Sequence, residues 1–71
     1  MEKIEFTING EFIELLGLLK ATGIAQTGGH AKLIVEDEEV FRNGELETRK
    51  RAKLVPGDVI EVGDEVRIVL K

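Results

Sequence analysis

The sequence contains no cysteine, serine, tryptophan or tyrosine, and it has a single histidine. Without cysteine the chain has no disulfide, no thiolate nucleophile and no cysteine metal site. The absence of serine excludes serine-based catalysis, and His30 alone cannot build a multi-histidine metal site. With only three phenylalanines, stacking on nucleic-acid bases is not a strong expectation either.

Long apolar runs are also absent. No segment approaches the roughly 20 consecutive apolar residues of a membrane span. The start Met1-Glu2-Lys3-Ile4 lacks the basic region and apolar run of a signal peptide. We therefore expect a cytoplasmic protein, of bacterial type, with no membrane partner. The 71 residues allow one small domain, 1–71, and an apolar fraction of 42% supplies a single compact core.

The first half of the chain predicts a strand followed by two helices. Apolar and polar residues alternate over 3–8, as in a half-buried strand, and Asn9-Gly10 ends it and offers a cap for the next element. A helix is expected over 11–22, stopped by Gly23, since apolar residues recur at helical spacing: Phe12, Leu15, Leu16 and Leu19, widened by Ile13 and Leu18. Thr27 is the expected N-cap of a second helix over 28–37, with an inner stripe of Ala31, Ile34 and Val35.

The second half predicts short strands joined by tight turns. Asn43-Gly44 is a strong hairpin signal, which places Arg42 opposite Glu45 and Phe41 opposite Leu46. Leu54-Val55 should return to the core, Pro56-Gly57-Asp58 should form a turn, and Gly63-Asp64 should join strands over 59–62 and 65–70. The fold class is therefore α+β, with two packed helices against a small antiparallel sheet of four or five short strands.

Charge is distributed unevenly along the chain. The net charge of −4 argues, taken alone, against a nucleic-acid partner. Residues 42–53 nevertheless carry five basic residues against two acidic ones, a balance of +3, between flanking segments of −5 and −2. Phosphate binding depends on the potential within about 8 Å at physiological salt. These five residues are thus either a solvated loop or a phosphate-binding surface: Arg42, Arg49, Lys50, Arg51 and Lys53.

The start of the second helix is another candidate anion site. Thr27-Gly28-Gly29-His30 places two glycines in the first turn, where each costs helix stability of roughly 0.5–1 kcal/mol against alanine. Close approach of an anion to free backbone N–H groups would explain them, with His30 and Lys32 as side-chain donors. Close packing of another element against the glycines would explain them equally well.

Two other features have simpler interpretations. His30 has no serine, cysteine or obvious paired carboxylate to work with, so it is a surface residue or a phosphate contact rather than a catalyst. The acidic run 36–39 lacks the spaced oxygen ligands and turn glycine of a calcium loop. It is interpreted as a solvated helix end that frays because acids there oppose the helix dipole. No metal, cofactor or small-molecule substrate is expected.

Residues 15–62 resemble the alpha-L RNA-binding motif, also called the S-four domain. The resemblance lies in Leu19-Lys20, in Thr27-Gly28-Gly29-His30-Ala31-Lys32, in Val40-Phe41-Arg42-Asn43-Gly44-Glu45 and in Pro56-Gly57-Asp58. The Thr-Gly-Gly-x-Ala-Lys form looks like the small stand-alone members, the YaaA/YbcJ type. Many relatives have two basic residues at 28–29, and many end the second helix with glycine and a basic residue where this chain has Glu38 and Glu39.

The resemblance implies non-catalytic binding of structured RNA, ribosomal or transfer RNA, in some members on a ribosomal particle. It points to Lys20, Thr27, Gly28, Gly29, His30 and Lys32, with Arg49, Lys50, Arg51 and Lys53 beyond the hairpin. Phosphate and shape contacts should dominate, because A-form grooves offer side chains little sequence to read. If this is right, Lys32 and residues 49–53 should share one face, with residues 36–39 pointing away or off its edge.

Other functions are kept as alternatives. The main one is a protein-interaction module whose acidic faces bind a basic partner. A ubiquitin-like sulfur carrier would need a Gly-Gly C-terminus, whereas this chain ends Val69-Leu70-Lys71. A helix-turn-helix DNA reader would have to use residues 28–37 for recognition, and the acidic second half of that segment would be repelled by the groove.

Overall fold

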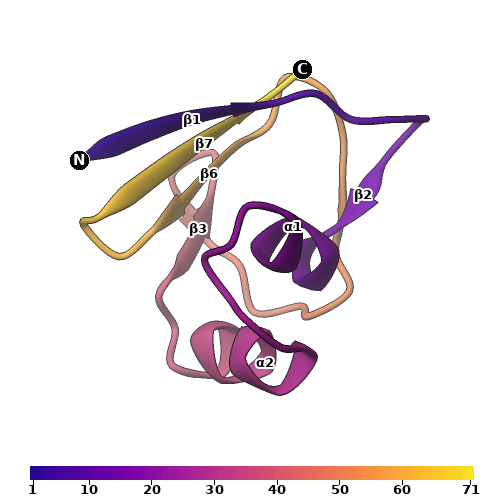
Figure 1. Cartoon of the computed structure of the whole chain (residues 1–71). Helices are drawn as coiled ribbons and strands as arrows, with labels where there is room; N and C mark the ends of the chain where they lie inside the picture. Colours follow the sequence, from indigo (N-terminus) through magenta and orange to yellow (C-terminus); the bar gives the residue numbers. More distant parts are fainter.

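The computed structural model describes residues 1–71 and has an α+β architecture (Figure 1). A five-stranded sheet has the strand order β1-β7-β6-β3-β4, two helices pack beside it, and two further strands form a separate small ladder. In chain order the elements are β1 (Glu2–Phe6), β2 (Ile13–Glu14), α1 (Leu15–Ala21), α2 (Gly28–Glu36), β3 (Val40–Arg42), β4 (Glu45–Leu46), β5 (Lys53–Leu54), β6 (Val59–Val62) and β7 (Val66–Leu70).

The main sheet is mixed rather than wholly antiparallel. The pairs β3–β4, β3–β6 and β6–β7 are antiparallel, as expected. The edge strand β1 instead lies parallel to β7, with Glu2 opposite Val66 and Phe6 opposite Leu70. Parallel strands cannot be joined by a tight turn and need a long connection. Here residues 7–65, which include both helices, connect the two strands.

Helix α1 begins four residues later than the apolar spacing suggests. Ile13 and Glu14 pair with Leu54 and Lys53 as the β2–β5 ladder, and the N–H of Leu15 donates to the carbonyl of Ala52 at 2.9 Å. The residue at the N-cap is therefore Glu14, which makes no side-chain capping bond, and Asn9-Gly10 does not cap the helix. Backbone pairing with β5, distant in sequence, replaces the first helical turn.

The second helix follows the sequence prediction closely. Thr27 is its N-cap, and the Thr27 hydroxyl accepts a hydrogen bond from the His30 N–H at 3.0 Å. Ala31, Ile34 and Val35 are its buried residues. The helix ends at Glu36, one residue before the expected end, and Glu38 lies in the left-handed region at φ 58°. Glycine is the usual residue in this conformation after a helix.

The tight turns also form where the sequence predicts them. Asn43 and Gly44 have φ of 53° and 87°, as a type I′ turn requires. The hairpin register is the expected one, with Phe41 opposite Leu46 and Arg42 opposite Glu45. This hairpin extends the main sheet with β4 as its edge strand.

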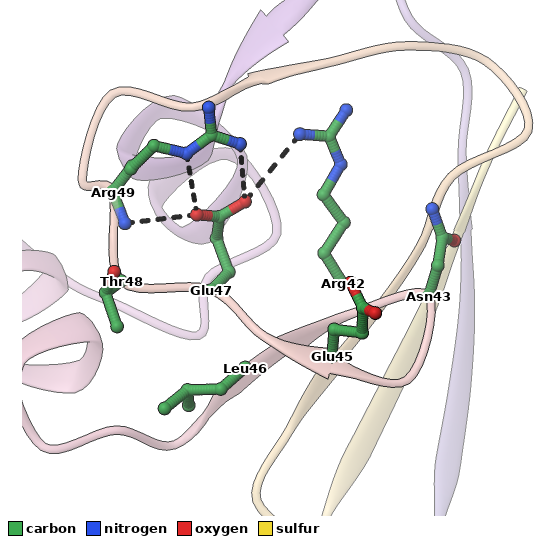
Figure 2. A pocket seen from close by; sticks show the side chains of 7 residues that line it. All are labelled: Arg42, Asn43, Glu45, Leu46, Glu47, Thr48 and Arg49. Atoms are coloured by element: carbon green, nitrogen blue, oxygen red, sulfur yellow. Dashed lines mark hydrogen bonds and ion pairs between the residues drawn. The ribbon is translucent and has the colours of Figure 1, made fainter.

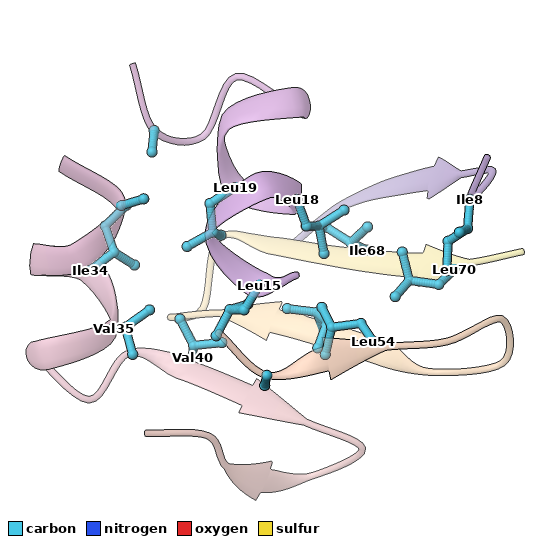
Figure 3. Packing of buried hydrophobic residues seen from close by; sticks show 14 residues of the cluster. Ile8, Leu15, Leu18, Leu19, Ile34, Val35, Val40, Leu54, Ile68 and Leu70 are labelled. Atoms are coloured by element: carbon cyan, nitrogen blue, oxygen red, sulfur yellow. The ribbon is translucent and has the colours of Figure 1, made fainter. Parts of the chain in front are cut away.

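The core is a cluster of 14 buried apolar residues between the helices and the sheet (Figure 3). Leu15, Leu18 and Leu19 reach it from α1, and Ile60 and Ile68 reach it from the sheet. Leu54 joins the core as expected, but Val55 is 42% exposed, since successive side chains of an extended segment point to opposite sides. Neither helix has the length and apolar character needed to cross a membrane.

Candidate nucleic-acid interface

The sequence-predicted site residues lie at four places: the end of α1, the start of α2, the end of β3 and the segment between β4 and β5. Thr27, Gly28, Gly29, His30 and Lys32 form the first turns of α2, and Lys20 is an exposed residue in the last turn of α1. Arg49, Lys50, Arg51 and Lys53, the basic segment, connect β4 to β5 and enter β5. Arg42 is half-buried at the end of β3.

The N-terminus of α2 presents unused backbone donors. The His30 N–H is taken by the Thr27 hydroxyl, and the Gln26 N–H donates to Nδ1 of His30 at 3.2 Å. The N–H groups of Gly28 and Gly29 donate to no acceptor within the protein. Free N–H groups at a helix N-terminus favour an anion, because the helix dipole adds to their partial charge.

The two glycines are not explained by packing. A Cβ added to Gly28 would meet no atom within 4 Å, and one added to Gly29 would meet only the Thr27 hydroxyl, at 3.9 Å. Neither glycine has a positive φ. Neither crowding nor backbone conformation therefore requires glycine at these two positions, and the close-packing explanation is wrong.

Each cation of the basic segment has a partner within the protein. Arg49 binds Glu47 at 3.1 Å, Lys50 binds Glu36 at 2.6 Å, and Arg51 lies 3.5 Å from Glu14. The ammonium of Lys53 lies over the ring of Phe12, 5.0 Å from its centroid. The side chains of Arg49 and Arg51 are still 71% and 80% exposed, so both remain within reach of an external phosphate.

The Lys50–Glu36 ion pair attaches the basic segment to α2. Hydrogen bonding and the charge of Lys50, helped by the charge of Lys32, hold the pKa of Glu36 below its ordinary value. Lys32 and Glu36 are one helical turn apart and so lie along one line of α2. Lys32 and Lys50 therefore flank Glu36 on one face. The expectation that residues 36–39 point away from this face or off its edge is wrong for Glu36, because its carboxylate pairs with Lys50.

Arg42 is held by acidic partners instead of facing solvent freely. It donates through Nη2 to Asp58 at 2.8 Å and to the carbonyl of Lys53 at 3.1 Å, and its Nη1 lies 3.7 Å from Glu47. Glu47 also accepts from Arg49, at the rim of an open polar depression of about 480 Å³ (Figure 2). Arg42 thus connects the hairpin to both ends of the basic segment and positions it.

The acids in this network are shifted toward their charged forms. Hydrogen bonds from Arg49, aided by the charges of Arg49 and Arg42, lower the pKa of Glu47 although burial opposes the shift. The same contact raises the pKa of Arg49. Burial acts to raise the pKa of Asp58, but hydrogen bonds from Val55, Asn43 and Arg42 and the charge of Arg42 outweigh it and lower the pKa.

Glu47 and Asp58 are not among the site residues predicted from the sequence. Both residues are buried. The role of Asp58 depends on its contact with Arg42, which is 16 residues away in the sequence. The apolar spacing predicts Phe12 on the buried helix face, yet it is 43% exposed beside Lys53. Only the charge pairing of Glu47 with Arg49, two residues apart, could be suspected from local sequence.

The chain is similar to known proteins over most of its length. Residues 6–70 match the family model described as "S4 domain". The chain is 38% identical over 58 residues to "Putative RNA-binding protein YbcJ" of Escherichia coli K12, covering 80% of this chain and 83% of that protein. It is 39% identical over 56 residues to "Probable ribosome maturation protein RlbA" of Bacillus subtilis 168, covering 79% of each. The alpha-L resemblance is confirmed: this chain belongs to the S4 domain family.

Proposed function

We propose that this protein binds structured RNA, ribosomal or transfer RNA, without catalysing a reaction. The binding face consists of the N-terminal turns of α2, Lys20 and Lys32, and the basic segment. The printed names of two relatives support this proposal, one as an RNA-binding protein and one as a ribosome maturation protein. A ribosomal particle in the cytoplasm is the setting that fits such a partner.

The Lys50–Glu36 ion pair, at 2.6 Å, is the observation that carries the proposal. It brings Lys50 to the last turn of α2, on the line of the helix that also carries Lys32, so cations of the basic segment and of α2 lie next to each other. Phosphates spaced along an RNA backbone can engage such an extended set of donors at once. Phosphate contacts of this kind position a protein on a helix without reading sequence.

Intramolecular ion pairs limit the strength of this binding. Glu36, Glu47 and Glu14 each compete with an RNA phosphate for a cation. The pairs of Lys50 and Arg51 are exposed, and exposed ion pairs are weak in water, so a polyanion can exchange with Glu36 and Glu14. Glu47 is buried and holds Arg49 more firmly. We therefore infer binding that is local and strongly dependent on salt concentration, and that is reinforced by other contacts on an assembled particle.

Charge reversal in the basic segment tests the proposal. The variant Arg49→Glu, Lys50→Glu, Arg51→Glu should abolish binding to ribosomal and transfer RNA, because three phosphate contacts become repulsive. Binding is measured by fluorescence anisotropy with labelled RNA at low salt, and circular dichroism confirms that the variant is folded.

The chain offers a closely matched control. Lys3, Arg67 and Lys71 lie on β1, on β7 and at the C-terminus, away from α2 (Figure 1). Arg67 and Lys71 also have carboxylate partners, Glu61 and Glu5. Reversing these three charges changes the net charge by the same amount and should weaken RNA binding only slightly. Equal loss in both triple variants would show a nonspecific charge effect and contradict the proposed face.

A protein partner is the competing outcome. Glu39, Asp64 and Glu65 line an open depression of about 400 Å³, where a basic partner could bind. If the wild-type chain binds neither ribosomal nor transfer RNA at low salt, the RNA proposal fails and this acidic side becomes the surface to study.

A further inference from the structure

Phe12 is an exposed aromatic residue that the fold does not use. The residue is 43% exposed, and it belongs neither to the buried core nor to the half-buried residues packed against the core. The neighbouring Ile13 does pack against the core and pairs with Leu54. Alternation along an extended segment therefore turns Phe12 to the outer side.

Phe12 is continuous with the basic segment. The Lys53 ammonium lies over its ring, 5.0 Å from the centroid. On the same side of the β2–β5 ladder, Glu14 pairs in register with Lys53, and its carboxylate lies 3.5 Å from the Arg51 guanidinium. The ladder thus places the apolar ring beside the Lys53 ammonium, and Glu14, which is paired with Lys53, holds the Arg51 guanidinium on the same side.

We propose that Phe12 is a stacking platform for an unpaired base at the end of an RNA duplex. Lys53 and Arg51 would contact the phosphates next to that base. This inference rests on the proposed function and deepens it, because it specifies a junction between duplex and single strand as the preferred RNA.

The chemistry of the cluster fits a nucleotide better than an acidic peptide. A nucleotide offers a flat apolar base and an anionic phosphate close together, and each has a matching group here. Every base can stack on an aromatic ring, so such a contact requires no particular sequence. An acidic side chain would engage Lys53 and Arg51 but would leave the ring of Phe12 exposed.

Two substitutions at the same position isolate the aromatic contact. Phe12→Leu keeps an apolar side chain and removes the ring, whereas Phe12→Tyr keeps the ring. Binding is compared for a blunt RNA duplex and for the same duplex with a single-stranded overhang. For the overhang RNA, Phe12→Leu should lose about 5- to 100-fold in affinity, and Phe12→Tyr should bind like wild type. For the blunt duplex all three proteins should bind alike.

A fluorescent base gives a readout that a merely structural role would not change. With 2-aminopurine as the first overhang base, stacking on the ring should quench its fluorescence with wild type and Phe12→Tyr but not with Phe12→Leu. Thermal unfolding of each variant verifies folding.

Three results would overturn the assignment. The first is that Phe12→Leu binds the overhang RNA as tightly as wild type does. The second is that Phe12→Leu loses the same affinity for the blunt and the overhang RNA. The third is that Phe12→Leu weakens binding of a poly-glutamate peptide as much as it weakens binding of the overhang RNA. Failure of wild type to bind either the blunt or the overhang RNA at low salt would instead contradict the proposed function itself.

Discussion

At the scale of single residues, Asp58 is the point on which the arrangement of the basic segment depends. Its carboxylate accepts from Arg42 at 2.8 Å, from the Asn43 amide at 3.0 Å and from the Val55 N–H at 3.0 Å. The same Arg42 guanidinium donates to the carbonyl of Lys53. An acidic residue behind the surface thus fixes the position of cations on it.

Asp58→Asn tests this role through stability and its dependence on pH. The folded pKa values of Asp58 and Glu47 lie below the ordinary 3.8 and 4.5. Their stabilisation is therefore complete above those ordinary values and is lost as pH falls through the lowered folded values. The variant should lose about 2 kcal/mol of unfolding free energy at neutral pH and lose less than wild type on acidification.

Urea unfolding at pH about 7 and about 3 measures both effects. Asp64→Asn, a change of the same kind at an exposed turn residue, serves as the control and should behave like wild type. If Asp58→Asn loses as much stability on acidification as wild type does, Asp58 is not the titrating group.

At the scale of elements, the start of α2 trades helix stability for an accessible backbone. Gly29→Ala should stabilise the fold by about 0.5–1 kcal/mol, since its Cβ meets open space apart from Thr27 Oγ1 at 3.9 Å. The added methyl group should at the same time weaken RNA binding, because it keeps a phosphate away from the free N–H groups.

Gly17→Ala in α1 is the matched control for this prediction. Its added Cβ makes only ordinary contact, with Ile13 Cγ1 at 3.6 Å, so it should also stabilise a helix but leave RNA binding unchanged. Thermal unfolding and RNA titration on both variants give the comparison. Undiminished RNA binding by Gly29→Ala would contradict a phosphate contact at this helix end.

Local elements could be predicted from the sequence, and long-range pairings could not. The Asn43-Gly44 hairpin and its register follow from two adjacent residues, and the Thr27 cap from one side chain. The start of α1 depends on Ile13–Glu14 pairing with Lys53–Leu54, and the parallel β1–β7 pair joins the two ends of the chain. No periodicity within a short window encodes such contacts.

The candidate site shows the same division. The charge balance along the chain predicts the basic segment as a candidate site. The two first-turn glycines predict a second candidate site at the start of α2. Their attachment through Lys50 and Glu36 depends on how the segment folds back on the helix. The exposure of Phe12 likewise follows from β2 replacing the first helical turn.

At the scale of the whole molecule, the net charge of −4 and RNA binding are compatible. The cations of the basic segment lie close to α2, as the Lys50–Glu36 pair shows. Three acidic residues, Glu39, Asp64 and Glu65, instead line the depression next to the β6–β7 turn. Electrostatic attraction acts over about 8 Å at physiological salt, so a phosphate at the basic face responds mainly to nearby charges.

The salt dependence of RNA binding is the most direct test of this account. Affinity for ribosomal or transfer RNA is measured over a range of salt concentrations, and its logarithm is plotted against the logarithm of salt concentration. Contacts with four or five phosphates predict a slope of roughly −3 to −4. A slope near zero, or no binding at low salt, would contradict phosphate recognition by this face.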